Sequence, residues 1–128
     1  MNDIVSKIKE KPGFRMIAGV ENEKINKAEK ELDVKFASEY RAYLSEFGVA
    51  SFNGHELTGI CNSKRLNVVD VTKEEKEIFP VGTEKLYVIE RLNLDGIVIW
   101  QSSSGEIYQS IPNHKITKIA ASLKEYIQ

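Results

Sequence analysis

The sequence predicts an α+β fold, in which helices pack against an antiparallel sheet within a single domain over residues 1–128. Apolar residues recur at helical spacing within residues 4–8, 25–32 and 40–47, and again over 116–127. Three short apolar runs separated by turn residues fill 86–109. Helices that are separated along the chain from a run of strands are typical of α+β domains. The length of 128 residues also suits one domain, and the sequence shows no internal repeat.

The first expected element is a short amphipathic helix with an apolar stripe within residues 4–8. Asn2 or Asp3 is placed to cap it, because an Asx side-chain oxygen accepts a hydrogen bond from a first-turn N–H. The Pro-Gly pair at 12–13 would end it. Residues 14–20 are apolar without a regular period, which indicates an extended or turn segment.

Two longer helices are expected next, separated by a break near residues 34–37. Asn22 is the predicted N-cap of the first and Ser38 that of the second. Gly48 would end the second helix in a left-handed conformation, which costs glycine nothing. The apolar faces consist of Ile25, Ala28 and Leu32 in the first helix and of Tyr40, Tyr43, Leu44 and Phe47 in the second.

The period of the apolar residues changes in the second half of the chain. Residues 56–60 indicate a short strand, 66–71 a strand or extended lead-in, and 72–79 a short helical turn that Thr72 would cap. Residues 86–109 predict a three-stranded antiparallel meander, since an Asp-Gly pair and a Ser-rich stretch separate its apolar runs. Residues 116–127 predict a C-terminal helix that covers the sheet.

Composition and charge narrow the classes of function. Lys and Arg number 18 and Asp and Glu 19, so the net charge is −1 and the basic excess of a nucleic-acid-binding protein is missing. Cys61 is the only cysteine, which excludes an intrachain disulfide and a cysteine metal cluster. The first residues lack the apolar core of a signal peptide, and no stretch reaches the ~20 apolar residues that cross a bilayer. We therefore expect a cytoplasmic protein that contacts neither membranes nor nucleic acid directly.

Few residues suggest catalysis. His55 and His114 have no second histidine at i+3 or i+4, which a helical metal-binding pair needs. Cys61 follows His55 by six residues, which in a strand corresponds to about 20 Å. The glycines form no phosphate-binding loop, and the Ser-rich run at 102–105 is a turn signal. We expect no enzyme, no cofactor and no metal. An activity based on His55, Cys61 or carboxylates at the sheet edge is the alternative.

Aromatic residues on the meander are the first candidates for binding a partner. Tyr87, Trp100 and Tyr108 fall on the three successive strands, where side chains on one face of paired strands approach within about 5 Å. An exposed aromatic patch would suit a protein interface. The alternative is that the three rings pack in the core beneath the helices.

Carboxylates are the second candidates. Those near the strand ends would form an acidic recognition rim, with solvated strand ends or a catalytic pair as alternatives. A denser group lies in one short stretch, and it would suit a partner with a basic surface, with a solvated loop and helix as the alternative. The first group comprises Glu56, Glu90, Asp95 and Glu106, and the second comprises Glu74, Glu75, Glu77 and Glu84.

An ordered set of motifs spans roughly residues 20–127. It includes Ile25-x-x-Ala28-Glu29-x-x-Leu32, then Phe36-Ala37-Ser38-Glu39-Tyr40-x-x-Tyr43-Leu44-x-x-Phe47-Gly48, then Phe52-Asn53-Gly54-x-Glu56-x-x-Gly59. In this order the motifs resemble the SUKH superfamily, which groups a fungal cell-wall-assembly regulator with many small bacterial proteins. The chain departs from the family pattern in two places. It has Phe36-Ala37 where the family has Leu-Pro, and it lacks an arginine soon after Thr72.

The resemblance implies a non-enzymatic binding protein. Bacterial members of the superfamily look like cytoplasmic immunity proteins, each of which binds and neutralises a cognate polymorphic toxin domain, often a nuclease. The alternative is an intracellular regulator or scaffold that binds an endogenous protein, and in either case we expect a monomer or weak dimer. By the same resemblance Glu29 would hold the helical pair to a backbone group or a neighbouring strand.

Overall fold

The computed structural model describes residues 3–128, and these form an α+β fold of helices and two antiparallel sheets. The first sheet has the order β1-β2-β3 and the second the order β4-β5-β6-β7. The helices are α1 (Ile4–Lys9), α2 (Asn22–Leu32), α3 (Ser38–Glu46), α4 (Val68–Ile78) and α5 (Leu123–Tyr126). The strands are β1 (Arg15–Ala18), β2 (Phe47–Phe52), β3 (His55–Glu56), β4 (Tyr87–Arg91), β5 (Val98–Gln101), β6 (Ile107–Ser110) and β7 (Thr117–Ala120).

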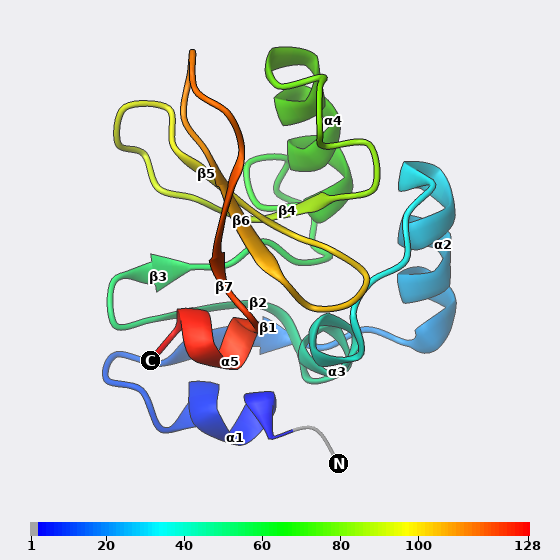
Figure 1. Ribbon diagram of the computed structural model, residues 1–128. Coiled ribbons are helices and arrows are strands. Elements are labelled where there is room, and N and C mark those ends of the chain that lie inside the picture. The colour runs from blue at the N-terminus through cyan, green and yellow to red at the C-terminus, as the bar shows by residue number, and fades with distance from the viewer. Residues whose placement is uncertain (1–2) are drawn as a thin grey trace.

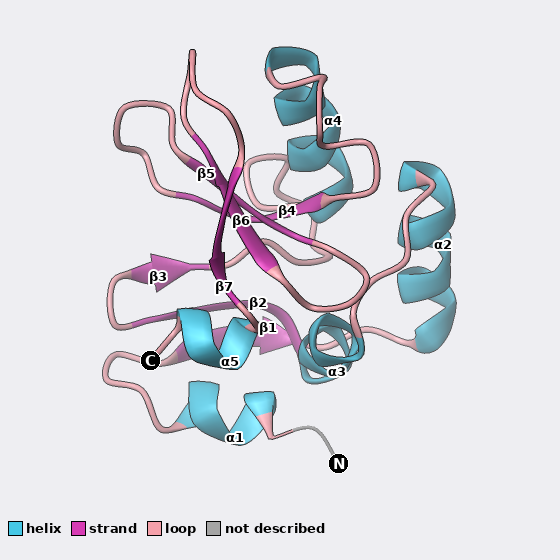
Figure 2. Ribbon diagram, viewed as in Figure 1, coloured by secondary structure: helices cyan, strands magenta, loops and turns pink. Residues whose placement is uncertain are grey.

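The two sheets lie one above the other, with α1, α3 and α5 beside the first sheet and α2 and α4 along one side (Figure 1). The segment after β3 joins them, as the ribbon coloured by secondary structure shows (Figure 2). In this segment Leu57 N donates to Ala50 O of β2 at 3.1 Å, and Thr58 N donates to Ile89 O of β4 at 2.8 Å. One short stretch of backbone therefore pairs with both sheets and fixes their relative position.

An aromatic cluster fills the centre of the core. The ring of Tyr87 lies 4.7 Å from that of Phe36 and 5.0 Å from that of Tyr40, and Tyr40 stacks on Tyr43 at 5.4 Å. Buried phenols need hydrogen-bond partners, because an unpaired polar group in the core costs about 1–3 kcal/mol. Each has one: Tyr40 OH binds Thr58 Oγ1, Tyr43 OH accepts from Ala50 N, and Tyr87 OH accepts from Ala37 N and donates to Gln101 Oε1.

The C-terminal region differs from the prediction of one helix over 116–127. Residues 117–120 form β7, which pairs with β6 and extends the predicted meander to four strands. The helix is confined to α5. Its start is held by Glu39, whose two carboxylate oxygens accept from Leu123 N at 2.6 Å and Lys124 N at 3.0 Å. The helical spacing of the apolar residues was misleading here because a short strand followed by a short helix gives the same pattern.

The expected helix boundaries are also corrected. The N-cap positions of α2 and α3 are Glu21 and Ala37, so Asn22 and Ser38 begin the helices and do not cap them. Asp3 makes no capping bond with its side chain, and the alternative cap Asn2 lies outside the described residues. Gly48 does not end a helix but lies within β2, which follows α3 without a loop. Its small size is needed there, since a Cβ would lie 2.7 Å from Ala18 O.

Helix α4 begins earlier than predicted. The β-branched run at its start suggested an extended segment, but Asn67 caps the helix by accepting from Val69 N at 2.9 Å. Tertiary burial of Val68 and Val71 outweighs the weak preference of β-branched residues for strands. Thr72 lies inside the helix, where its hydroxyl accepts from Val88 N at 3.0 Å. This bond ties α4 to β4.

We predict that the fold is lost in one cooperative step at alkaline pH. Burial raises the pKa of the Tyr40, Tyr43 and Tyr87 phenols. In the unfolded chain the pKa of tyrosine is about 10. Above that pH the unfolded state binds fewer protons than the folded state, so stability falls as pH rises. Phenolate absorbance and far-UV circular dichroism should therefore change together. Buried tyrosines that ionise one by one in a folded chain would contradict the expectation.

Candidate functional site

The three meander aromatics do not form a surface patch. Tyr87 pairs with Gln101 and Trp100 with Tyr108, so Tyr87 and Trp100 lie on opposite faces of the sheet. Both are completely buried: Tyr87 in the main core, and Trp100 in a second cluster that contains Val88. Tyr87 and Trp100 therefore pack in the core, which was the alternative expectation. The expectation that these two rings contact a partner is corrected. Tyr108 is partly exposed, and its hydroxyl donates to Glu106 at 2.9 Å.

The strand-end carboxylates do not form one acidic rim either, because Glu90 points into the protein. Its side chain is 3% exposed and accepts three hydrogen bonds, from His55 Nδ1 at 2.9 Å, from Tyr126 OH at 2.6 Å and from Glu56 N at 2.9 Å. These bonds join β3, β4 and the C-terminal helix. Three donors meet the hydrogen-bonding needs of this buried carboxylate, so we assign Glu90 a structural role.

The two residues of the catalytic alternative, His55 and Cys61, have separate hydrogen-bond partners. His55 binds Glu90 through Nδ1, while Cys61 Sγ contacts Ser63 O at 3.6 Å. Among residues 3–128, no hydrogen bond joins the histidine to the cysteine, and no group of His, Cys, Asp and Glu side chains is arranged to hold a metal ion.

The acidic residues from Glu74 to Glu84 do not gather in one place, and Glu84 lies beyond the end of α4. Glu75 binds Arg91 Nε at 2.8 Å, and Glu74 binds the Nη2 of the same guanidinium. Glu84 lies elsewhere, where its backbone oxygen accepts from Lys76 at 3.1 Å. Glu77 is exposed and forms no ion pair with any residue in 3–128. Only the first two of the four residues therefore meet.

An apolar hollow of about 260 Å³ opens beside Arg91. Ile78 at the end of α4 lines it and is 62% exposed, an unusual position for a large aliphatic side chain. The turn between β4 and β5 and the connection between β6 and β7 reach the same upper end of the molecule as this end of α4 (Figure 1). The hollow is lined by Glu75, Ile78, Phe79, Arg91, Asn93, Gly96, Ile97, Val98 and Pro112.

The β4–β5 turn borders the hollow in an uncommon backbone conformation. Asn93, Asp95 and Gly96 all have positive φ angles, of 54°, 51° and 72°. Asn and Asp tolerate this region better than other side chains, which explains their presence in the turn. Gly96 packs on the ring of Pro112, since a Cβ there would lie 3.0 Å from the proline Cγ. Leu94, at the tip of the turn, is 59% exposed.

A second, smaller hollow continues this surface towards β3. It shares Arg91 and Asn93 with the first and also includes Arg65 and Glu56, which form an ion pair at 2.7 Å. Arg65 holds the pKa of the Glu56 carboxyl below its usual value. We name this region the Arg91 surface. We include in it the hollow-lining residues Glu56, Arg65, Glu75, Ile78, Phe79, Arg91, Asn93, Gly96, Ile97, Val98 and Pro112. It also includes Glu74, which is paired with Arg91, and the exposed Leu94 and Asp95, which lie between Asn93 and Gly96 in the turn.

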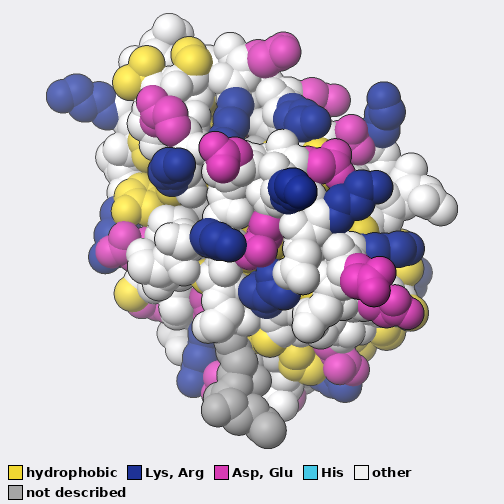
Figure 3. Space-filling view, turned by 90° about the vertical axis from the view of Figure 1, so that its right-hand side faces the viewer, with side chains coloured by type: hydrophobic (Ala, Val, Ile, Leu, Met, Phe, Trp, Pro, Cys, Tyr) yellow, Lys and Arg dark blue, Asp and Glu magenta, His cyan; other side chains and the backbone are white. Residues whose placement is uncertain are grey.

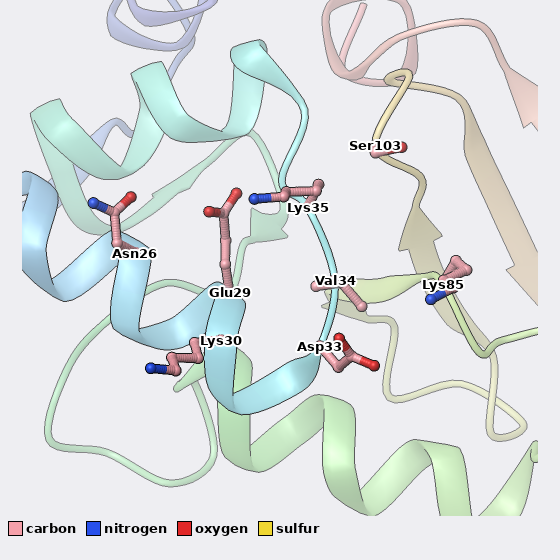
Figure 4. A pocket seen from close by; sticks show the side chains of 8 residues that line it. All are labelled: Asn26, Glu29, Lys30, Asp33, Val34, Lys35, Lys85 and Ser103. Atoms are coloured by element: carbon pink, nitrogen blue, oxygen red, sulfur yellow. The ribbon is translucent and has the colours of Figure 1, made fainter.

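A larger hollow, of about 560 Å³, has a different character. Figure 4 shows that Asn26, Glu29 and Lys30 come from α2 and that Lys85 and Ser103 lie across from this helix. Charges of both signs line it. The side of the molecule that carries α2 and α4 is likewise covered with intermixed acidic and basic side chains (Figure 3). Such mixed charge is typical of a solvated face and less suited to the apolar centre of an interface.

Glu29, which lines this hollow, holds the helical pair to a backbone group, as the resemblance to the superfamily implied. One carboxylate oxygen accepts from Phe36 N at 2.7 Å, and the other binds Arg41 Nη1 at 3.0 Å. The side chain thus connects the end of α2, the following linker and α3. It fixes the helical pair, and its hydrogen bonds are already taken within the fold.

The whole chain matches a known protein family. A family model of SUKH_5, described as SMI1-KNR4 cell-wall, matches residues 1–128. The chain belongs to the SUKH superfamily. Among curated proteins no match was found. Among the residues described, no helix of this SUKH protein is long and apolar enough to cross a membrane.

Sequence reasoning found part of the Arg91 surface and missed the rest. Glu56, Glu74, Glu75 and Asp95 were predicted partner-binding residues from charge. The first three line the hollows or pair with Arg91, and Asp95 lies in the turn between Asn93 and Gly96. The apolar members were missed. Leu94 carried a signal, because a large aliphatic residue between Asn93 and Asp95 at a turn tip has no core to enter.

We predict that Tyr126→Phe destabilises the fold more than Tyr108→Phe. Tyr126 donates to the buried Glu90, and burial followed by the nearby Glu90 charge raises the pKa of its phenol. Loss of a hydrogen bond to a buried charged group costs about 1.5–3 kcal/mol. Tyr108 donates to the surface carboxylate Glu106, which water can solvate instead. Urea unfolding of both variants measures the difference, and equal losses would contradict the assigned role of Glu90.

We also predict that Gly96→Ala is more destabilising than Gly54→Ala. Both glycines have positive φ, 72° and 83°, so each alanine costs about 1–2 kcal/mol in backbone strain. Only the methyl at position 96 would press on Pro112, since nothing lies within 4 Å of a Cβ at Gly54. The difference between the two free energies of unfolding therefore measures the packing of the turn. A difference of zero would mean that the turn moves freely.

Proposed function

We propose that this SUKH protein is an immunity protein, which binds a toxin domain in the cytoplasm and neutralises it by covering the toxin's active cleft. Membership of the superfamily across residues 1–128 is the observation that carries the proposal. The mechanism needs no reacting group on this chain. It needs only a surface that stays bound while it excludes the toxin's substrate.

The Arg91 surface supplies the features that a protein interface requires. Interfaces combine an apolar centre with a polar rim, and arginine is enriched in them. Here the apolar centre is the hollow beside Ile78, and the rim consists of ion pairs that Arg65 and Arg91 make with carboxylates. A stable complex buries about 800 Å² on each partner, so the partner would also cover the exposed tip at Leu94.

A second candidate function is that of a regulator or scaffold that binds an endogenous protein. The matching family, SMI1-KNR4 cell-wall, favours it because its name refers to the cell wall. Both candidates use a binding surface and no catalytic residue. They differ in the identity of the partner, and the gene neighbourhood distinguishes them, because an immunity gene lies beside the gene of its toxin.

Co-expression tests the immunity function. The C-terminal domain of a large toxin encoded directly upstream should stop growth when expressed alone, and the SUKH protein should restore growth and form a one-to-one complex with it. As a matched pair, Ile78→Glu, within the Arg91 surface, should impair rescue, whereas Val81→Glu should not. Both replaced side chains are largely exposed, at 62% and 83%, so neither change should unfold the protein. No rescue by the unaltered protein would reject the function.

A further inference from the structure

The Arg91 surface carries an excess of negative charge, although the chain as a whole is nearly neutral at −1. Its carboxylates are those of Glu56, Glu74 and Glu75, together with that of the exposed Asp95 in the turn between Asn93 and Gly96. Its cations are the two guanidinium groups of Arg65 and Arg91. Acidic residues are thus concentrated around the apolar hollow. A charged rim of one sign selects a partner surface of the opposite sign and repels one of the same sign.

The two arginines cannot reverse this preference, because carboxylates already occupy them. Arg65 binds both oxygens of Glu56, at 2.7 and 3.2 Å. Arg91 lies between two glutamates of α4, with its Nε at 2.8 Å from Glu75. Asp95 makes no ion pair with any residue in the described range 3–128. The surface therefore offers an incoming group a free anion and no free cation.

The hollow itself suits the stem of a basic side chain. Its apolar wall includes Ile78, Ile97 and Pro112, and the ion pair of Glu75 and Arg91 also lines it. Arginine and lysine have a long hydrocarbon stem that packs on apolar surface and a charged head that stays at the polar boundary. A stem in the hollow would bring such a head to the carboxylates of the rim.

We propose that the Arg91 surface docks a basic face of the protein partner, with the stem of a partner arginine or lysine in the apolar hollow and its head beside Asp95 and Glu75. This assignment of the partner's chemistry rests on the proposed binding function. The large hollow beside α2 is less suited to the same partner, because its lysines outnumber its two carboxylates, Glu29 and Asp33.

Peptide titration tests the chemistry without a toxin. The amide spectrum of the ¹⁵N-labelled full chain is recorded with acetyl-Arg-Leu-Arg-amide and with acetyl-Glu-Leu-Glu-amide. The basic peptide should shift the amides of Ile78, Asn93, Gly96 and Ile97, and added salt should weaken the effect. The acidic peptide should leave them unshifted. Equal shifts with both peptides, or no shifts at these amides, would overturn the proposal.

A charge-removing variant sharpens the test. Asp95→Asn should weaken binding of the basic peptide about two- to fivefold, the range of an exposed ion pair. Asp33→Asn is the matched control, since Asp33 has nearly the same φ, 53° against 51°, and lies at the large hollow. It should leave the affinity unchanged, and equal effects of the two variants would count against the assignment.

The same variants separate this inference from the proposed function. If the unaltered protein rescues cells but Asp95→Asn binds the toxin with unchanged affinity and salt dependence, the docking chemistry is wrong and the immunity function stands. If the unaltered protein fails to rescue while the peptide results hold, the immunity function is wrong and the basic-partner surface stands.

Discussion

One half-buried carboxylate, that of Glu39, holds together elements from both halves of the chain. It accepts from Gln101 Nε2 at 3.0 Å and from the first two amides of α5. Gln101 in turn accepts from Tyr87 OH, and Tyr87 accepts from Ala37 N. The free N–H groups at a helix N-terminus stabilise a negative charge, so the carboxylate needs no cation beside it. In a chain of hydrogen bonds like this one, the loss of any member leaves its neighbours unpaired in the core.

The Arg91 surface depends on this network through β4. Tyr87 begins the strand inside the core, and Arg91 ends it at the surface. Between them Val88 donates to Thr72, which fixes α4 along the strand, while Glu90 anchors β3 and the C-terminal helix. The same five residues of β4 therefore serve the core at one end and present the guanidinium at the other. The core therefore fixes the path of β4 and with it the place where Arg91 reaches the surface.

The sequence was informative where a pattern has one physical explanation. The helical stripes of α2 and α3 and the turn residues between β4, β5 and β6 indicated those elements correctly. It failed where tertiary pairing decides, as in residues 117–120, whose apolar spacing fits a helix but whose backbone completes the second sheet. The same limit applies to the site. Charge indicated Glu74, Glu75 and Asp95, whereas the face of Trp100 and the meeting of Ile78 with Pro112 depend on register and on contacts distant in sequence.

The two parts of the molecule differ in how freely their sequence can change. The hydrogen bonds of Glu39, Glu90 and the core tyrosines restrict substitution at those positions. The Arg91 surface is instead built largely from one end of a helix, a turn and a connection, and such segments tolerate replacement and changes of length. A gene of this kind can therefore diversify at the turn around Leu94 while it keeps the same interior. Recognition of a changing partner would then evolve on a scaffold that does not change.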